Sequence, residues 1–178
     1  MQGRFVQPEV VTTHFHLREG DQVADFGAGS GFFLQALSRV VGPSGRVYAC
    51  EIQRELVAKL GDVARAEGLT NVDPLWCDLE EPGGVKIADG ALDTVVIINT
   101  LFQLEDKAAT LKEAARTLRS GGKLFIIDWT ESFGGLGPQP DHVVSESEAK
   151  ALTESQQFVF ERSFDAGDHH YGLAFKRP

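Results

Sequence analysis

Short apolar runs rich in β-branched residues alternate along the chain with longer segments in which apolar residues recur every three or four positions. The first pattern is typical of buried strands, and the second of helices with one apolar face. Their alternation predicts an α/β fold in which helices cover a mostly parallel sheet. Strands are expected at residues 23–26, 46–50, 72–77, 94–98, 123–128, 157–164 and 171–176, and helices at 30–41, 53–67, 106–119 and 146–156.

Several boundaries of these elements carry local signals. Ser145, followed three residues later by Glu148, predicts a capping box at the start of the last helix. Gly68 is placed to cap the second helix, and Gly121-Gly122 is expected to end the third before the next strand begins. The first helix should turn one apolar stripe inward, formed by Phe33, Ala36, Leu37, Val40 and Val41.

The length of 178 residues fits a single domain spanning 1–178, with residues 1–19 as an N-terminal lid or helix segment and residues 20–178 as the core. No apolar run approaches the roughly 20 residues that a membrane-spanning helix needs. The first five residues lack the basic and then apolar layout of a signal peptide. A cytoplasmic protein is therefore expected.

Charge and cysteine content narrow the range of partners. The net charge of −9, with Lys and Arg scattered, disfavours a nucleic acid, although a local basic patch would still allow RNA binding. Cys50 and Cys77 form no CxxC motif and the histidines are scattered. We expect buried free thiols and no metal site.

The segment 24–32 places three glycines where the first strand turns into the first helix. Glycine allows backbone conformations and a close ligand approach that a β-carbon would obstruct, and ligands of open α/β sheets bind beside such a turn. A dinucleotide fingerprint counted from Gly27 would have its last glycine at position 32, where this chain has Phe32. Asp25 would also repel a pyrophosphate, and it is suited to orient the loop or to meet a cationic part of a ligand.

A second acidic residue indicates a nucleoside ligand. Glu51 ends the second strand, 20 residues beyond Gly31, where a carboxylate can accept hydrogen bonds from ribose hydroxyls. Each residue alone also fits a structural role, Gly29 as a turn and Glu51 as a solvated strand end. Their joint spacing favours a nucleoside-binding site.

The segment 20–131 resembles the class I, or Rossmann-like, S-adenosylmethionine-dependent methyltransferases. Residues 24–31 look like the first motif of that family, and residues 93–99 look like its fourth-strand motif. Residues 118–124 are similar to its glycine turn before the fifth strand, with Ser120 in place of the commoner proline. These motifs span about two thirds of the chain.

The resemblance also implies roles for single residues. Glu51 would hold the ribose hydroxyls, Asp78 would meet the adenine amino group, and the backbone amide of Leu79 would meet the adenine ring. The implied cofactor is S-adenosylmethionine, and its product is S-adenosylhomocysteine. The cofactor-binding residues implied in this way are Asp25, Gly27, Ala28, Gly29, Gly31, Glu51, Ile52, Asp78, Leu79 and Asn99.

For the fold, the resemblance implies a seven-stranded sheet in the order 3-2-1-4-5-7-6, with strand 7 antiparallel and helices on both faces. Within the family the chain looks closest to the small stand-alone members grouped with the quinone-biosynthesis-type methyltransferases (the type 11/25 group). Only residues 1–19 and the loop 130–144 are left over to cover a substrate. A small or exposed acceptor site is therefore expected.

The acceptor is expected where the fourth and fifth strands end. A methyl group on a sulfonium is already activated, so alignment supplies much of the catalysis, and a base is needed only for a protonated nucleophile. If the sixth strand is parallel to these two, the turn 165–170 shares their edge, and His14 and His16 approach from the N-terminal segment. Candidate catalytic residues are Asp128, His169 and His170, and candidate substrate-binding residues are Phe102, Gln103 and Trp129.

These acceptor-side residues also have structural interpretations. Asp128 fits a strand-end carboxylate bonded to loop amides, and Trp129 fits a plug of the core. A histidine on a turn is often solvated or a packing residue, although histidine is the natural base near neutral pH. Alignment alone, a histidine and Asp128 are therefore all accounts of how the acceptor is activated.

Other functions fit the sequence less well. A short-chain reductase needs a Tyr-x-x-x-Lys pair, and neither Tyr48 nor Tyr171 has a lysine four residues on. Asn99 and Phe102 keep two members of the Asn-Pro-Pro-aromatic sequence with which some relatives grip the amine of a base, but both prolines are absent. We predict a methyltransferase that acts on a small-molecule acceptor by in-line displacement. The alternative is a non-catalytic S-adenosylmethionine-binding module, or a subunit that needs a partner.

Overall fold

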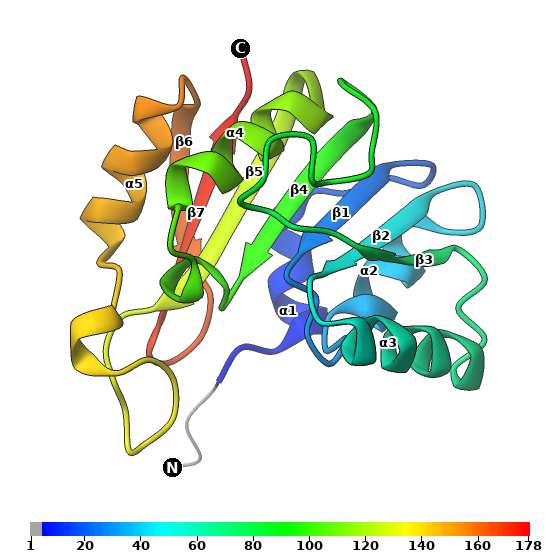
Figure 1. Ribbon diagram of the computed structural model, residues 1–178, viewed down its shortest axis with the longest axis horizontal. Helices are drawn as coiled ribbons and strands as arrows, with labels where there is room; N and C mark the ends of the chain where they lie inside the picture. Colours follow the sequence, from blue (N-terminus) through cyan, green and yellow to red (C-terminus); the bar gives the residue numbers. More distant parts are fainter. Residues whose placement is uncertain (1–4) are drawn as a thin grey trace.

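The computed structural model describes residues 5–178, and their strands form one seven-stranded sheet with helices on both faces (Figure 1). The sheet order is β3-β2-β1-β4-β5-β7-β6, and β7 is antiparallel to both of its neighbours, which confirms the expected topology. The strands are β1 (Gln22–Phe26), β2 (Arg46–Glu51), β3 (Val72–Trp76), β4 (Leu92–Ile98), β5 (Leu118–Trp129), β6 (Val159–Asp165) and β7 (His170–Lys176).

The helices are short, and those after β1 lie between strands in the chain, whereas α1 and η1 precede β1. None of those within the described residues is long and apolar enough to cross a membrane. The α-helices are α1 (Pro8–Val11), α2 (Leu34–Val41), α3 (Arg54–Ala66), α4 (Lys107–Thr117) and α5 (Glu146–Ser155), and the 3-10 turns are η1 (Thr12–Phe15), η2 (Leu101–Gln103) and η3 (Pro140–His142).

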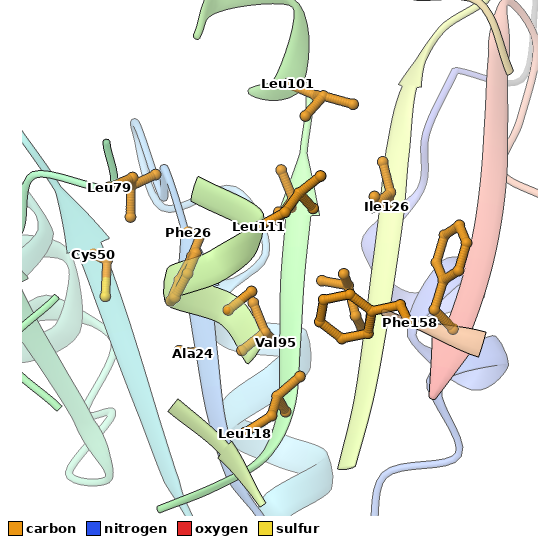
Figure 2. Packing of buried hydrophobic residues seen from close by; sticks show 14 of the residues in the cluster. Ala24, Phe26, Cys50, Leu79, Val95, Leu101, Leu111, Leu118, Ile126 and Phe158 are labelled. Atoms are coloured by element: carbon orange, nitrogen blue, oxygen red, sulfur yellow. The ribbon is translucent and has the colours of Figure 1, made fainter. Parts of the chain in front are cut away.

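The inner strands send alternate side chains into two separate apolar layers, because successive residues of a strand point to opposite faces. Val95 of β4 packs in the layer covered by α4 and α5, beside Leu111 of α4 and Ile126 of β5 (Figure 2). Val96, the next residue, packs in the layer covered by α1, α2 and α3, together with Leu37. Burying a side chain of this size contributes roughly 1.5–3 kcal/mol, so both faces stabilise the central strands.

Helix α2 begins later than the sequence pattern predicts. Residues 30–33 form a turn, and the helix starts at Leu34 instead of residue 30. Its buried stripe is therefore centred on Leu34, Leu37 and Val41, while Val40, which we expected to face inward, is 38% exposed. The late start leaves the glycine-rich segment free to curve away from the end of β1.

Strand β5 is longer than expected and helix α4 is shorter. The helix ends at Thr117, and β5 already begins at Leu118, which pairs with Leu92. The pair Gly121-Gly122 was predicted to break the helix, but it lies within the strand, where Gly121 has φ +76° and the register to β4 shifts. The glycines thus mark an irregularity of the strand.

The remaining boundaries agree closely with the pattern. Ser145 and Glu148 form the predicted capping box at the start of α5. In the N-terminal segment 1–19, residues 1–4 lie outside the described part, and the following residues form α1 and η1. Because β6 is antiparallel to β7, it runs parallel to β5, and the turn between β6 and β7 lies at the carboxyl edge of the sheet.

Candidate functional site

The glycine-rich turn leaves β1 at the carboxyl edge and is held by the neighbouring strand. The amides of Gly27 and Ala28 both donate to the carbonyl of Cys50, each at 2.9 Å. Gly27 has φ +87°, and a β-carbon there would lie 2.5 Å from the hydroxyl of Thr100. Beside Gly29 there is open space, since the nearest atom to a β-carbon would be a backbone oxygen 4.0 Å away. The turn therefore needs glycine at position 27 and leaves room for a ligand beside Gly29.

Glu51 fastens this turn to the end of β2. One carboxylate oxygen accepts from the Gly29 amide at 3.1 Å, and the other accepts from the amides of Ile52 and Gln53 at 2.9 and 3.0 Å. A carboxylate has about four acceptor positions, so these three bonds do not exhaust it. Glu51 can hold the turn and still accept from a ligand hydroxyl.

A cavity of about 420 Å³ lies between this turn, the ends of β2 and β4, and the loop after β3. Nine of the ten expected cofactor-binding residues line it. The exception is Gly31, where a β-carbon would lie 3.0 Å from Leu34 and from Leu60, so this glycine serves the packing of α2 against α3. The nine that line the cavity are Asp25, Gly27, Ala28, Gly29, Glu51, Ile52, Asp78, Leu79 and Asn99.

Other cavity-lining residues were not picked out by the sequence as cofactor-binding. Val6 lines the cavity from the N-terminal segment, where no sequence motif indicates a ligand-binding residue. Thr100 directly follows Asn99, and Gln53 directly follows Ile52. Their position next to expected cofactor-binding residues could have identified both as cavity-lining residues. The remaining ones are Ser30, Phe32, Phe33, Leu56, Glu80, Ile98, Gln103 and Leu104.

Two buried acceptor atoms in this cavity lack a hydrogen-bond partner among residues 5–178, namely the Oδ1 atoms of Asp25 and Asn99. Asp25 is 3% exposed, and burial, followed by the nearby charge of Glu51, raises its pKa to about 7. Asn99 has φ +52°, an uncommon conformation for a residue other than glycine, and the Gln103 side chain donates to its carbonyl at 2.8 Å. Because both residues line the cavity, a hydrogen-bond donor of a ligand is a candidate partner for these two atoms.

Comparison with known proteins identifies the family. A family model described as a methyltransferase domain matches residues 17–172. The chain is 30% identical to an S-adenosylmethionine-dependent methyltransferase from Aquifex aeolicus, whose crystal structure gives a TM-score of 0.90 with 98% of this chain and 91% of that one covered. The chain belongs to the S-adenosylmethionine-dependent methyltransferases.

Curated relatives are longer than this chain. This chain is 33% identical to an arsenite methyltransferase of Aquipseudomonas alcaligenes over 69% of its own length and 39% of the relative's. It is 30% identical to the ubiquinone/menaquinone biosynthesis C-methyltransferase of Haemophilus ducreyi over 65% of its own length and 44% of the relative's. The chain therefore spans about two fifths of the length of these two relatives.

The residues around this cavity fit S-adenosylmethionine, the donor of the family to which the chain belongs. Asp25, Asn99 and Glu51 line it, and each has a side-chain oxygen that can accept from an N–H or O–H group of a ligand. Asp78 is held in place by the amide of Glu80, which donates to its Oδ1 at 3.0 Å. The glycine turn leaves space for a backbone-to-ligand approach that a β-carbon would reduce.

On the acceptor side, Asp128 lies at the end of β5 and is 1% exposed. Its carboxylate accepts from its neighbour Trp129 at 2.8 Å and from the amide of Phe102 at 3.2 Å, so it ties β5 to η2. Burial raises the pKa of Asp128 to about 6, although these backbone bonds oppose the rise. It does not line the donor cavity, whereas Gln103 of the same turn η2 does.

His169 and His170 lie beside Asp128 and Trp129, because Trp129 pairs with His170 across β5 and β7. The ring of His169 stacks on Phe133 and bonds to Glu131 at 2.8 Å. The His170 ring packs against Trp129 with centroids 4.2 Å apart, and its Nδ1 lies 2.9 Å from the carbonyl of Asp168.

The tautomer of His170 follows from its partner. A carbonyl oxygen only accepts, so Nδ1 carries the proton and Nε2 carries the lone pair. No residue among 5–178 is bonded to that Nε2 atom. Burial lowers the pKa of His170, which favours the neutral ring.

A second hollow of about 710 Å³ adjoins the donor cavity, with Gln103 and Leu104 in the walls of both. Phe102 lines only this second hollow, which extends to η3 and α5. Trp129 lines neither, and its ring lies against Gly137, where a β-carbon would be 2.6 Å from it. The structure thus brings Phe102 and Gln103 together beside the donor cavity and places Trp129 in the packing of the 130–140 loop.

Proposed function

We propose that this chain binds S-adenosylmethionine in the cavity beside the glycine turn and transfers its methyl group to a small-molecule acceptor that lies against η2. The observation that carries the proposal is the coincidence of nine expected donor-binding residues around one cavity with unpartnered acceptors at Asp25 and Asn99. The family assignment supplies the reaction type.

The proposed roles on the donor side follow from these contacts. Glu51 accepts from the ribose hydroxyls while it keeps the turn in place, and Asp78 and the Leu79 amide meet the adenine. Asn99 accepts from a donor group at the opposite end of the ligand, and Asp25 meets the positive charge that the donor carries. When bound, S-adenosylmethionine supplies a methyl group on a positively charged sulfur that is already activated for transfer.

On the acceptor side, Asp128 is proposed as a positioning residue. By accepting from the Phe102 amide it fixes η2, and with it Gln103, which lines both hollows. The base for an acceptor that arrives protonated is assigned to His170, whose Nε2 lone pair is unbonded within residues 5–178 and whose neutral form is favoured by burial. Its Nε2 is buried and His170 lines neither hollow, so this role requires the acceptor to displace the packing against Trp129. His169, which is held by Glu131 and Phe133, is assigned to shaping the turn.

A small molecule fits this site better than a nucleic acid. Among the described residues, no Lys or Arg lines the donor cavity, and one, Lys107, lines the second hollow. Binding a phosphate backbone needs several such contacts. The relatives named for arsenite and for quinone biosynthesis also point to small acceptors.

The test is methyl transfer from labelled donor into total RNA and into a small-metabolite extract, at low and at moderate salt. We expect label in the metabolite pool, with little change on adding salt. Salt-sensitive label in RNA with none in the metabolites would overturn the small-molecule acceptor. Donor binding without transfer into either pool would support the non-catalytic module instead.

A further inference from the structure

The charges around the donor cavity are all of one sign. Four carboxylates are among its lining residues, from Asp25 at the end of β1, Glu51 at the end of β2, and Asp78 and Glu80 after β3. No Lys, Arg or His of residues 5–178 lines it, and the contributions of β4 and η2 are not titratable. An uncompensated set of like charges attracts a cation and disfavours a neutral or anionic ligand.

These carboxylates differ in how the protein stabilises their ionised forms. Glu51 accepts from three backbone amides, and Asp78 and Glu80 each accept from one, Glu80 from the amide of Asp106. Asp25 is buried, and its Oδ1 has no donor among the described residues. A buried carboxylate without donors is costly to ionise, so Asp25 is the member of the set that holds a proton most readily.

The surroundings of Asp25 point the same way from each neighbouring strand. On β2 the charged group is Glu51, beside the buried thiol of Cys50, and the cavity-lining residues at the end of β4, Ile98 to Thr100, are neutral. Burial and the charge of Glu51 raise the pKa of Asp25 to about 7. These surroundings favour the protonated form of Asp25 below about pH 7.

The donor and its product differ by one charge. S-adenosylmethionine has a cationic sulfonium, a cationic amine and an anionic carboxylate, so it carries one net positive charge. S-adenosylhomocysteine has lost the sulfonium charge and is neutral overall. A cavity lined only by carboxylates therefore discriminates between them.

We propose that this cavity selects its ligand by charge, and that Asp25 gives up a proton when a cationic donor binds, so that the neutral product is held more weakly than the donor. The inference rests on the proposed function, since it requires that the donor bind in this cavity. It gives Asp25 a role beyond holding the turn. The same difference favours release of product after each transfer.

The sharpest test compares S-adenosylhomocysteine with sinefungin, in which a carbon bearing an ammonium group replaces the sulfur. The two ligands have nearly the same shape but differ by one positive charge. Calorimetry at about pH 6.5, in two buffers of different ionisation heat, measures the affinity and the protons released together. We expect sinefungin to bind about 10-fold more tightly at low salt. It should release between about half a proton and one proton, while S-adenosylhomocysteine releases close to none.

Asp25→Asn keeps the shape of the side chain and removes its proton. In this variant the proton release should vanish, and the preference for sinefungin should shrink by at least about 3-fold. Glu67→Gln, which removes one exposed charge at the end of α3, is the matched control and should leave both quantities unchanged.

Three results would count against the proposal. The charge selection is overturned if the wild type at low salt binds S-adenosylhomocysteine as tightly as sinefungin or more tightly, and if sinefungin binding releases no proton. This outcome does not contradict the proposed donor site. Proton release that persists in a folded Asp25→Asn variant assigns the proton to another group and overturns the role of Asp25. Failure of the wild type to bind either ligand overturns the proposed function, and this inference with it. If the variant does not fold, the two-ligand comparison on the wild type still decides the charge selection.

Discussion

The two halves of the carboxyl edge are built in different ways. On the donor side, at β1, β2 and β4, backbone geometry shapes the cavity, and buried acceptors such as Asp25 Oδ1 are left without donors. On the acceptor side, at β5 and β7, most side chains are already bonded to protein groups, as Asp128 is to two amides and His169 is to Glu131. A ligand completes the first half, whereas the second half is largely complete without one.

This difference indicates which parts of the sequence determine donor specificity and which determine acceptor specificity. The donor side depends on turns and strand ends that a short motif encodes, because glycine and carboxylate positions are fixed by local sequence. The acceptor side depends on packing between distant segments, such as Trp129 against Gly137 and Phe133 against His169. The same donor can thus be combined with an acceptor site particular to one chain.

The largest effect is expected from the acceptor side, where replacing His170 by Gln should lower turnover about 100-fold or more while the affinity for S-adenosylhomocysteine changes less than about 2-fold. Turnover is followed on the labelled product of the metabolite pool. Because burial lowers the pKa of His170, wild-type turnover should persist below the ordinary titration range of histidine, since the base is still neutral there.

His169→Gln is the matched control, because it removes a ring of the same kind from the same turn, and it should retain most turnover. If a double Gln variant turns over normally at every pH, neither histidine removes a proton. Alignment alone, or Asp128, would then be the better account.

The next largest effect is expected on the donor side. Gly27→Ala places a β-carbon 2.5 Å from Thr100 at a residue with φ +87°. Strain of this kind costs of order 1–3 kcal/mol before the clash is added, so donor affinity should fall at least about 100-fold. Calorimetry with S-adenosylhomocysteine measures this loss.

Gly134→Ala separates strain from contact. Gly134 also has positive φ, but nothing lies within 4 Å of its β-carbon position, and it belongs to the acceptor-side loop. We expect wild-type donor affinity in this variant. Equal losses of donor affinity in the Gly27→Ala and Gly134→Ala variants would show that the donor side and the acceptor side are not independent, and would contradict the distinction drawn between them.

The smallest of these effects is expected at Glu51. Glu51→Ala should weaken binding of S-adenosylhomocysteine by about 10- to 100-fold with the fold intact, because hydrogen bonds to a charged group contribute roughly 1.5–3 kcal/mol. Far-UV circular dichroism checks the fold. Glu154→Ala, an exposed acid on α5, provides the control. An unchanged dissociation constant for Glu51→Ala would refute the ribose assignment.

The strand order and the outline of the donor cavity could be predicted from the sequence. Gly27, Glu51 and Asp78 each follow or end a short apolar run, and in a parallel sheet such positions meet at one edge. Their approach to one another therefore depends on little beyond the order of the strands. The start of α2 was misplaced because the turn 30–33 has helical neighbours and no breaker other than glycine.

Only the tertiary structure decided which polar groups have partners. Asp25 and Asp128 are both acids at buried strand ends, and their sequence contexts are alike. Asp128 receives the amide of Phe102, 26 residues away in the chain, while Oδ1 of Asp25 receives no donor among the described residues. The reach of Val6 into the cavity and the proton on Nδ1 of His170 were fixed in the same way. Such properties arise where segments distant in sequence meet, so residue type and spacing along the chain do not encode them.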